Sequence, residues 1–175
     1  MFERILVAID GGEQSKPVLE MACALADKYD AKLGIVYVAE PQDVSDELVQ
    51  VAEIEGVIRA PSYSQSLESL DYMGRSRMRD EIQHGAVIGR LAEQVGQQVV
   101  AEAEAFTKSQ NVKAVKTFVR SGDIADAILA VANQAKADLI VLGHERRSML
   151  RSLIHKSVAE GVNSKAKCPC LIFAA

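Results

Sequence analysis

The chain has 175 residues, the length of one ordinary domain, and 49% of them are hydrophobic while 25% are charged. This composition is typical of a globular protein and excludes a disordered or fibrous one. The 20 Lys and Arg residues are outnumbered by 24 Asp and Glu residues, for a net charge of -4, so nucleic-acid binding is not expected and any anion site has to be local.

The sequence predicts a cytoplasmic protein without a membrane partner. No secretion signal is expected at the N-terminus, and no apolar run reaches the roughly 18 residues that a membrane-spanning helix needs. Three cysteines, Cys23, Cys168 and Cys170, make an odd count that favours reduced thiols over disulfides. The cysteines and histidines have no metal-ligand spacing, so no metal is predicted.

Apolar runs and helical stripes alternate from the start of the chain. The run 5–9 is continuously apolar, which is typical of a central strand covered on both faces. A helix is predicted from Ser15, a residue suited to the N-cap, with Pro17 in its first turn. A second strand is predicted over 33–38, and a long helix follows the apolar stripe over 88–106.

The same alternation continues to the end of the chain. Strands are predicted over 115–119, 139–142 and 171–174. One helix is predicted after its N-cap Asp123, and another around 157–163. The order βαβαβαβαβ predicts an α/β fold, a doubly wound, open, parallel five-stranded sheet of Rossmann-like type with helices on both faces. Sites are then expected at the carboxyl ends of the strands.

One connection is far longer than the others. The segment from about residue 40 to 85 is predicted to be an insertion between the second strand and the second helix, within a single domain over 1–175. Its first half is rich in acids, and three arginines follow later. A solvated surface excursion and a lid over the pocket both remain open as interpretations.

Four segments in this order resemble the universal stress protein family. They are Val7-Ala8-Ile9-Asp10-Gly11, Gly122-Asp123-Ile124-Ala125, the run Ala137-Asp138-Leu139-Ile140-Val141-Leu142-Gly143, and Cys168-Pro169-Cys170-Leu171-Ile172. The resemblance implies an adenine nucleotide alpha hydrolase-like fold and a non-enzymatic stress-response protein with protein partners. It also implies a homodimer paired through the final strand, and ATP as the nucleotide to consider.

The nucleotide-binding members of that family carry Gly-x2-Gly-x9-Gly followed by Ser or Thr. Gly143 and Ser157 match the first glycine and the final hydroxyl, but Arg146 and Lys156 stand at the other two glycine positions. A side chain there hinders the close approach of backbone to phosphate, so weak ATP binding or none is expected. The added cations either attract an anion or belong to a solvated basic loop.

The resemblance places two more residues at the nucleotide. Asp10 follows the central strand and is implied to lie near adenosine, although an Asx turn onto the next two residues explains it equally well. Val38 matches the position whose backbone meets the adenine edge, and otherwise it is core. Ser157 is also explained by a capping box with Glu160, and Gly143 by a sharp turn.

Two further functions remain as alternatives. One is a dimeric adaptor that acts without nucleotide. The other is an ATP-using enzyme in which residues 10–15 form a pyrophosphate-binding loop, an interpretation that Asp10 disfavours because a carboxylate repels phosphate. No catalytic triad or nucleophile elbow is apparent, so no catalytic residue is predicted.

Overall fold

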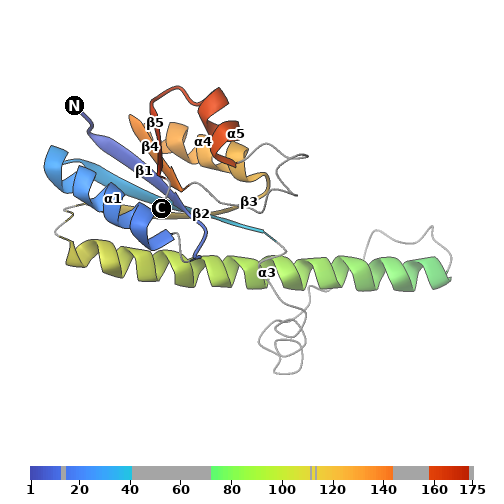
Figure 1. The fold of residues 1–175 in the computed structure, drawn as a ribbon. Coiled ribbons are helices and arrows are strands. Elements are labelled where there is room, and N and C mark those ends of the chain that lie inside the picture. The colour runs from blue at the N-terminus through green and yellow to red at the C-terminus, as the bar shows by residue number, and fades with distance from the viewer. Residues whose placement is uncertain (13–14, 41–71, 111, 113, 144–157, 174–175) are drawn as a thin grey trace. The chain divides into compact units, whose positions relative to one another are not determined.

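The computed structural model describes residues 1–12, 15–40, 72–110, 112, 114–143 and 158–173 (Figure 1). Arg146, Lys156, Ser157 and most of the expected insertion lie outside these residues. The chain divides into two compact units, Met1–Val38 with Gly96–Ala175, and Ala39–Val95. The residues of the helix α3 (Tyr72–Ser109) are divided between the units.

The first unit contains a five-stranded sheet. Its strands in chain order are β1 (Arg4–Ile9), β2 (Lys32–Ala39), β3 (Val115–Ser121), β4 (Leu139–Gly143) and β5 (Cys170–Phe173). Their order across the sheet is β3-β2-β1-β4-β5, so the first strand is central as the sequence predicts. β1 runs parallel to both β2 and β4, and β4 runs parallel to β5. The predicted doubly wound α/β class is confirmed.

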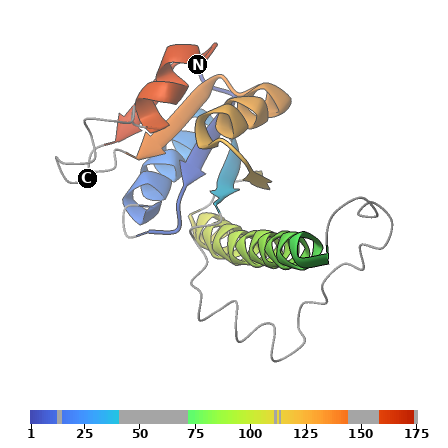
Figure 2. The ribbon, with the colours of Figure 1, turned by 90° about the vertical axis from the view of Figure 1, so that its right-hand side faces the viewer.

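Helices cover both faces of this sheet (Figures 1 and 2). On one face α1 (Ser15–Tyr29) packs against the odd-numbered side chains of β1, and Ala103 of α3 joins the same core. On the other face α4 (Ile124–Ala135) and α5 (Val158–Lys165) pack against Leu6 and its neighbours. Because both faces are covered, the central strands are buried, which is why their sequences are continuously apolar.

Local sequence signals explain where α4 begins and ends. Asp123 is the N-cap, as predicted, and its carboxylate accepts a hydrogen bond from the Asp126 N–H. Lys136 closes the helix in the left-handed conformation, with φ of 53°, and its N–H donates to the carbonyls of Ala132 and Asn133. Gly122, with φ of 108°, supplies the sharp turn between β3 and this helix.

Several elements differ from the sequence predictions, most of them by one or two residues at an end. α3 begins at Tyr72, inside the segment predicted as an insertion, because residues 72–87 are rich in strong helix formers that no apolar stripe reveals. The last strand is Cys170–Phe173 rather than 171–174. α1 begins at Ser15, but the serine hydroxyl bonds the preceding loop rather than acting as the predicted N-cap. Among the described residues, no helix combines the length and the apolarity needed to cross a membrane.

Candidate functional site

The strand register brings three of the predicted site residues to one edge of the sheet. Ile9 of β1 is level with Tyr37 of β2, and Val7 is level with Val141 of β4. One residue beyond Ile9 is Asp10, which is level with Val38 of β2, and β4 ends at Gly143, level with Ile9. All three therefore lie at the carboxyl edge, where open α/β sheets hold their ligands.

Asp10 and Ser15 organise the loop between β1 and α1. The Ser15 hydroxyl accepts hydrogen bonds from the N–H groups of Asp10 and Gly11, at 3.0 and 2.9 Å. It donates to Oδ1 of Asp10 at 2.6 Å, and the Gly12 N–H donates to the same oxygen at 2.9 Å. The Asx turn considered for Asp10 is therefore present.

These hydrogen bonds decide what the loop can offer a ligand. The N–H groups of Asp10, Gly11 and Gly12 all have acceptors within the loop itself. A phosphate would have to displace them and would meet the Asp10 carboxylate, so the pyrophosphate-loop interpretation gains no support from the geometry. Both side-chain bonds of Asp10 use Oδ1, and the exposed carboxylate presents Oδ2 as a second acceptor.

Gly11 lets the loop pass close to α3. Its φ of 76° lies in the left-handed region that glycine adopts readily. A Cβ at this position would approach Cγ2 of Val99 to 3.0 Å. Two independent constraints therefore require glycine directly after Asp10.

Gly143 has a packing reason that the sequence did not reveal. A Cβ there would lie 3.1 Å from Cγ2 of Val18 on α1. The glycine thus lets α1 pack against the end of β4, and this contact suffices to explain it without a ligand. Val38 is half-buried, and its side chain packs with the α4 and α5 core. Only its backbone is therefore left to contact a ligand at this edge.

Three of the predicted binding residues belong to one segment that the structure does not describe. Arg146, Lys156 and Ser157 lie outside the described residues, and so does the whole segment 144–157. The formal charge of that segment and the replacement of its glycines remain observations of the sequence alone.

Cys168 and Cys170 lie away from this edge, before and at the start of β5. Burial raises the pKa of the Cys168 thiol above its ordinary value of 9.0, and the Asp138 carboxylate raises it further. Burial also raises the pKa of Cys170, with a smaller contribution from Cys168. Within the described ranges, no group of three or more His, Cys, Asp or Glu side chains is placed to hold a metal ion.

A model of the universal stress protein family matches residues 1–174. The chain belongs to this family. Two stress-response relatives from Bacillus subtilis are similar over nearly their whole length. The universal stress protein YxiE is 27% identical over 98% of this chain and 99% of its own, and the stress response protein NhaX is 29% identical over 97% and 96%.

Solved universal stress proteins share the fold. A universal stress protein in complex with cAMP superposes with a TM-score of 0.62 at 18% identity, covering 99% of this chain and 97% of its own. A universal stress protein from Archaeoglobus fulgidus in complex with dAMP superposes with a TM-score of 0.54 at 15% identity, covering 97% and 96%. At these identities the likeness establishes the architecture of this universal stress protein, not its ligand.

Sequence reasoning did not predict the role of Ser15, whose hydroxyl holds the Asp10 carboxylate in place. In the sequence, the spacing of Asp10 and Ser15 indicates only a phosphate-loop pattern. Two glycines between an aspartate and a serine also allow the chain to fold back, so that the two side chains meet. That spacing was the available signal.

Proposed function

We propose that this universal stress protein is a non-enzymatic, cytoplasmic stress-response protein whose carboxyl sheet edge binds the nucleoside part of an adenine nucleotide. Asp10 would accept hydrogen bonds from the ribose or adenine, and the backbone of Val38 would meet the base. Gly143, Ser157, Arg146 and Lys156 would lie toward the phosphates. The protein would act as a homodimer with protein partners.

The observation that carries this proposal is the Asp10 loop. The carboxylate follows the central strand, its Oδ1 is held by Ser15 and Gly12, and its Oδ2 takes part in neither bond. A fixed, exposed acceptor at the carboxyl edge suits a hydroxyl or amino group of a nucleoside. The solved relatives in complex with cAMP and dAMP support an adenine ligand.

The proposed affinity for ATP is weak. The three N–H groups of the Asp10 loop are already bonded, so they add little to phosphate binding. In the sequence, Arg146 and Lys156 replace two motif glycines, which removes the close backbone approach that phosphates need. Binding should therefore depend on the nucleoside more than on the number of phosphates.

The test is calorimetric titration of the wild type and Asp10→Asn with adenosine and AMP. Asparagine keeps an Oδ1 for Gly12 and Ser15, but replaces the free carboxylate oxygen by an NH₂ donor. A hydrogen bond to a charged group contributes roughly 1.5–3 kcal/mol, so adenosine should bind at least about tenfold more weakly. Adenosine is the decisive ligand because it has no phosphate. The loss of the negative charge of Asp10 would by itself favour a phosphate, and this would mask the loss of the hydrogen bond.

Asp123→Asn is the matched control. Asp123 is also exposed, follows β3 at the same edge, and asparagine caps a helix about as well as aspartate. Its adenosine affinity should equal that of the wild type. Equal adenosine binding by Asp10→Asn and the wild type would overturn the role of Asp10, and no binding of adenosine or AMP by the wild type would overturn the proposal itself.

A further inference from the structure

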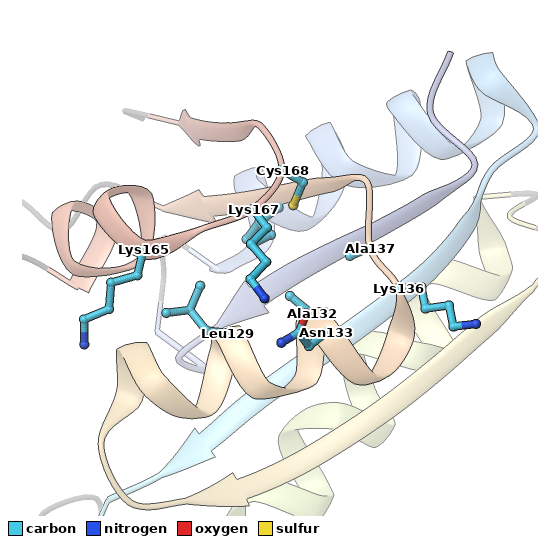
Figure 3. A pocket seen from close by; sticks show the side chains of 9 residues that line it. Leu129, Ala132, Asn133, Lys136, Ala137, Lys165, Lys167 and Cys168 are labelled. Atoms are coloured by element: carbon cyan, nitrogen blue, oxygen red, sulfur yellow. The ribbon is translucent and has the colours of Figure 1, made fainter.

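A cavity of about 320 Å³ lies at the amino edge of the sheet, opposite to the edge that carries Asp10 (Figure 3). Its walls come from the second half of α4, from the turn into β4, and from the segment that joins α5 to β5. All of them belong to the first unit. The cavity is therefore a place separate from the proposed nucleoside site, at the low end of the roughly 300–1,000 Å³ typical of ligand pockets.

The lining combines an apolar wall with a basic rim. The apolar side chains are those of Leu129, Ala132, Ala137 and Ile140. Three lysines, Lys136, Lys165 and Lys167, also line the cavity, and the lining contains no acidic residue. Two carboxylates lie nearby, since Asp126 pairs with Lys165 and Asp138 raises the pKa of the lining Cys168, so the positive charge left for a ligand is that of Lys136 and Lys167.

The three lysines differ in how they are engaged. Lys165 donates to Asp126 at 2.8 Å, whereas no described residue forms an ion pair with Lys136 or Lys167. In Figure 3 the Lys167 side chain extends over the cavity toward Asn133, whereas Lys136 and Lys165 stand at its two ends and extend away from it. Lysine stems are flexible, so their amines can turn toward a bound anion.

A helix-end explanation for the lysines is also available, since cations stabilise the negative ends of helices. The last carbonyls of α4 already accept backbone hydrogen bonds, because Lys136 N–H donates to Asn133 and Ala137 N–H donates to Ala132. On α5 the Ala166 N–H donates to Val162. A lysine is therefore less needed to stabilise these helix ends. The helix-end explanation also does not account for Lys167, which lies beyond the end of α5 and lines the same cavity.

We propose that this cavity binds a small organic anion that carries a carboxylate on an apolar chain. The carboxylate would lie between Lys136 and Lys167, which form no ion pair with a described residue, and the chain would lie against the half-buried Leu129 and Ala137. Neither part of the lining alone selects such a ligand. Apolar walls would accept a neutral molecule equally well, and exposed lysines would accept any anion weakly.

The probe pair is octanoate and octanamide, which match in size and differ in charge. Octanoate should shift the backbone amide resonances of Asn133 and Ala137 in two-dimensional NMR spectra and leave those of Gly11 and Gly12 unmoved. It should also slow the alkylation of Cys168, which lines the cavity, relative to Cys170, which does not. Octanamide should bind at least about tenfold more weakly, as expected when a charge-assisted contact is lost.

The variant Lys136→Gln with Lys167→Gln should reduce octanoate affinity at least about tenfold. Lys28→Gln is the matched control, because Lys28 is an exposed lysine in the last turn of α1, on the other face of the sheet. Its octanoate affinity should be unchanged.

Three results would overturn the proposal. One is equal binding of octanoate and octanamide, which would mean a merely apolar hollow. Another is an equal loss of affinity in Lys28→Gln and the double variant, which would mean diffuse charge attraction. The third is the absence of shifts at Asn133 and Ala137 at millimolar octanoate.

Discussion

At the scale of single residues, the glycines are needed for two different reasons. Some have a backbone conformation that other residues rarely adopt, and others lie where a side chain would collide with a neighbour. Gly11 has φ of 76° and faces Val99, whereas Gly122 has φ of 108° and a Cβ added to it would have no heavy atom within 4 Å. Gly122 therefore needs glycine for its backbone alone, but Gly11 needs it for its backbone and for its neighbour. Gly143 needs it for its neighbour Val18 alone.

This difference predicts an order of stabilities. Gly122→Ala should lower the free energy of unfolding by about 1–2 kcal/mol from backbone strain, and Gly11→Ala should lower it further because the contact with Val99 is added. Gly85→Ala, in open space on α3, should be neutral or stabilising by up to about 1 kcal/mol. Urea denaturation of the three variants checks the order. Equal losses at Gly11 and Gly122 would show that the loop moves freely away from Val99.

The buried thiol of Cys23 predicts a pH dependence. Burial raises its pKa above the ordinary 9.0, opposed by the hydrogen bond with Thr107 and aided by Glu20. The folded chain therefore keeps a proton that the unfolded chain releases, so this contribution to stability is complete below pH 9 and is lost as the pH rises above it. In urea denaturation at a series of pH values, the free energy of unfolding of the wild type should fall above pH 9 more steeply than that of Cys23→Ala. The half-buried Cys170, changed to Ala, should alter the slope less, and parallel pH profiles of the wild type and Cys23→Ala would contradict this account.

At the scale of elements, the sequence predicts which segments form strands and helices better than it predicts how they end. The alternation of continuous apolar runs with helical stripes predicts every described strand, because strands buried on both faces have no polar side. The start of α3 at Tyr72 is missed because its first turns carry no apolar stripe. The strand order across the sheet and the contact of Gly143 with Val18 depend on tertiary packing, which no local pattern encodes.

The same limit applies to the candidate site. The sequence places Asp10 after the central strand, and parallel pairing then brings Val38 and Gly143 to the same edge. It does not decide between an Asx turn and a ligand for Asp10, because the fold-back of Ser15 depends on a loop conformation. The two roles prove compatible, since the turn uses one carboxylate oxygen and leaves the other at the surface.

The N-cap of α4 gives a prediction at this scale. Asp123→Ala should lower the free energy of unfolding by about 1 kcal/mol, because the Asp126 N–H loses its acceptor. Asp123→Asn should stay within a few tenths of a kcal/mol of the wild type, since its amide oxygen also accepts. Thermal unfolding of both variants tests this. An equal loss in both would mean that the charge of Asp123, not its hydrogen bond, stabilises the helix.

At the scale of the whole molecule, the two outer strands of the sheet, β3 and β5, differ in charge. The outer strand β3 carries Lys116 and Arg120, whose charged groups lie 5.1 and 5.5 Å from the Phe118 ring centroid. β5 reads Cys-Leu-Ile-Phe, has no charge, and exposes 39% of Ile172. Charged side chains on an edge strand oppose pairing with another chain, so β5 is the edge expected to pair.

We therefore predict a homodimer through β5. The Pro169 carbonyl accepts from Ile140 N–H of β4, so the alternation of the strand turns the N–H of Ile172 to the outer edge. Ile172→Lys should convert the dimer to monomer in light scattering, and Thr117→Lys on β3 should leave it dimeric. Leu171 is a poorer choice for the change, because it packs against the α1 core. A monomeric wild type at micromolar concentration would refute the prediction.

The claim that an adenine nucleotide binds at the carboxyl edge is tested most directly by NMR titration of isotope-labelled protein with AMP. The account predicts that the amide resonances of Gly11, Gly12, Val38 and Gly143 shift together and saturate along one binding curve. Those of Asn133 and Cys168, at the amino edge, should remain in place. Absence of shifts at the first group, or shifts confined to the amino edge, would contradict the account.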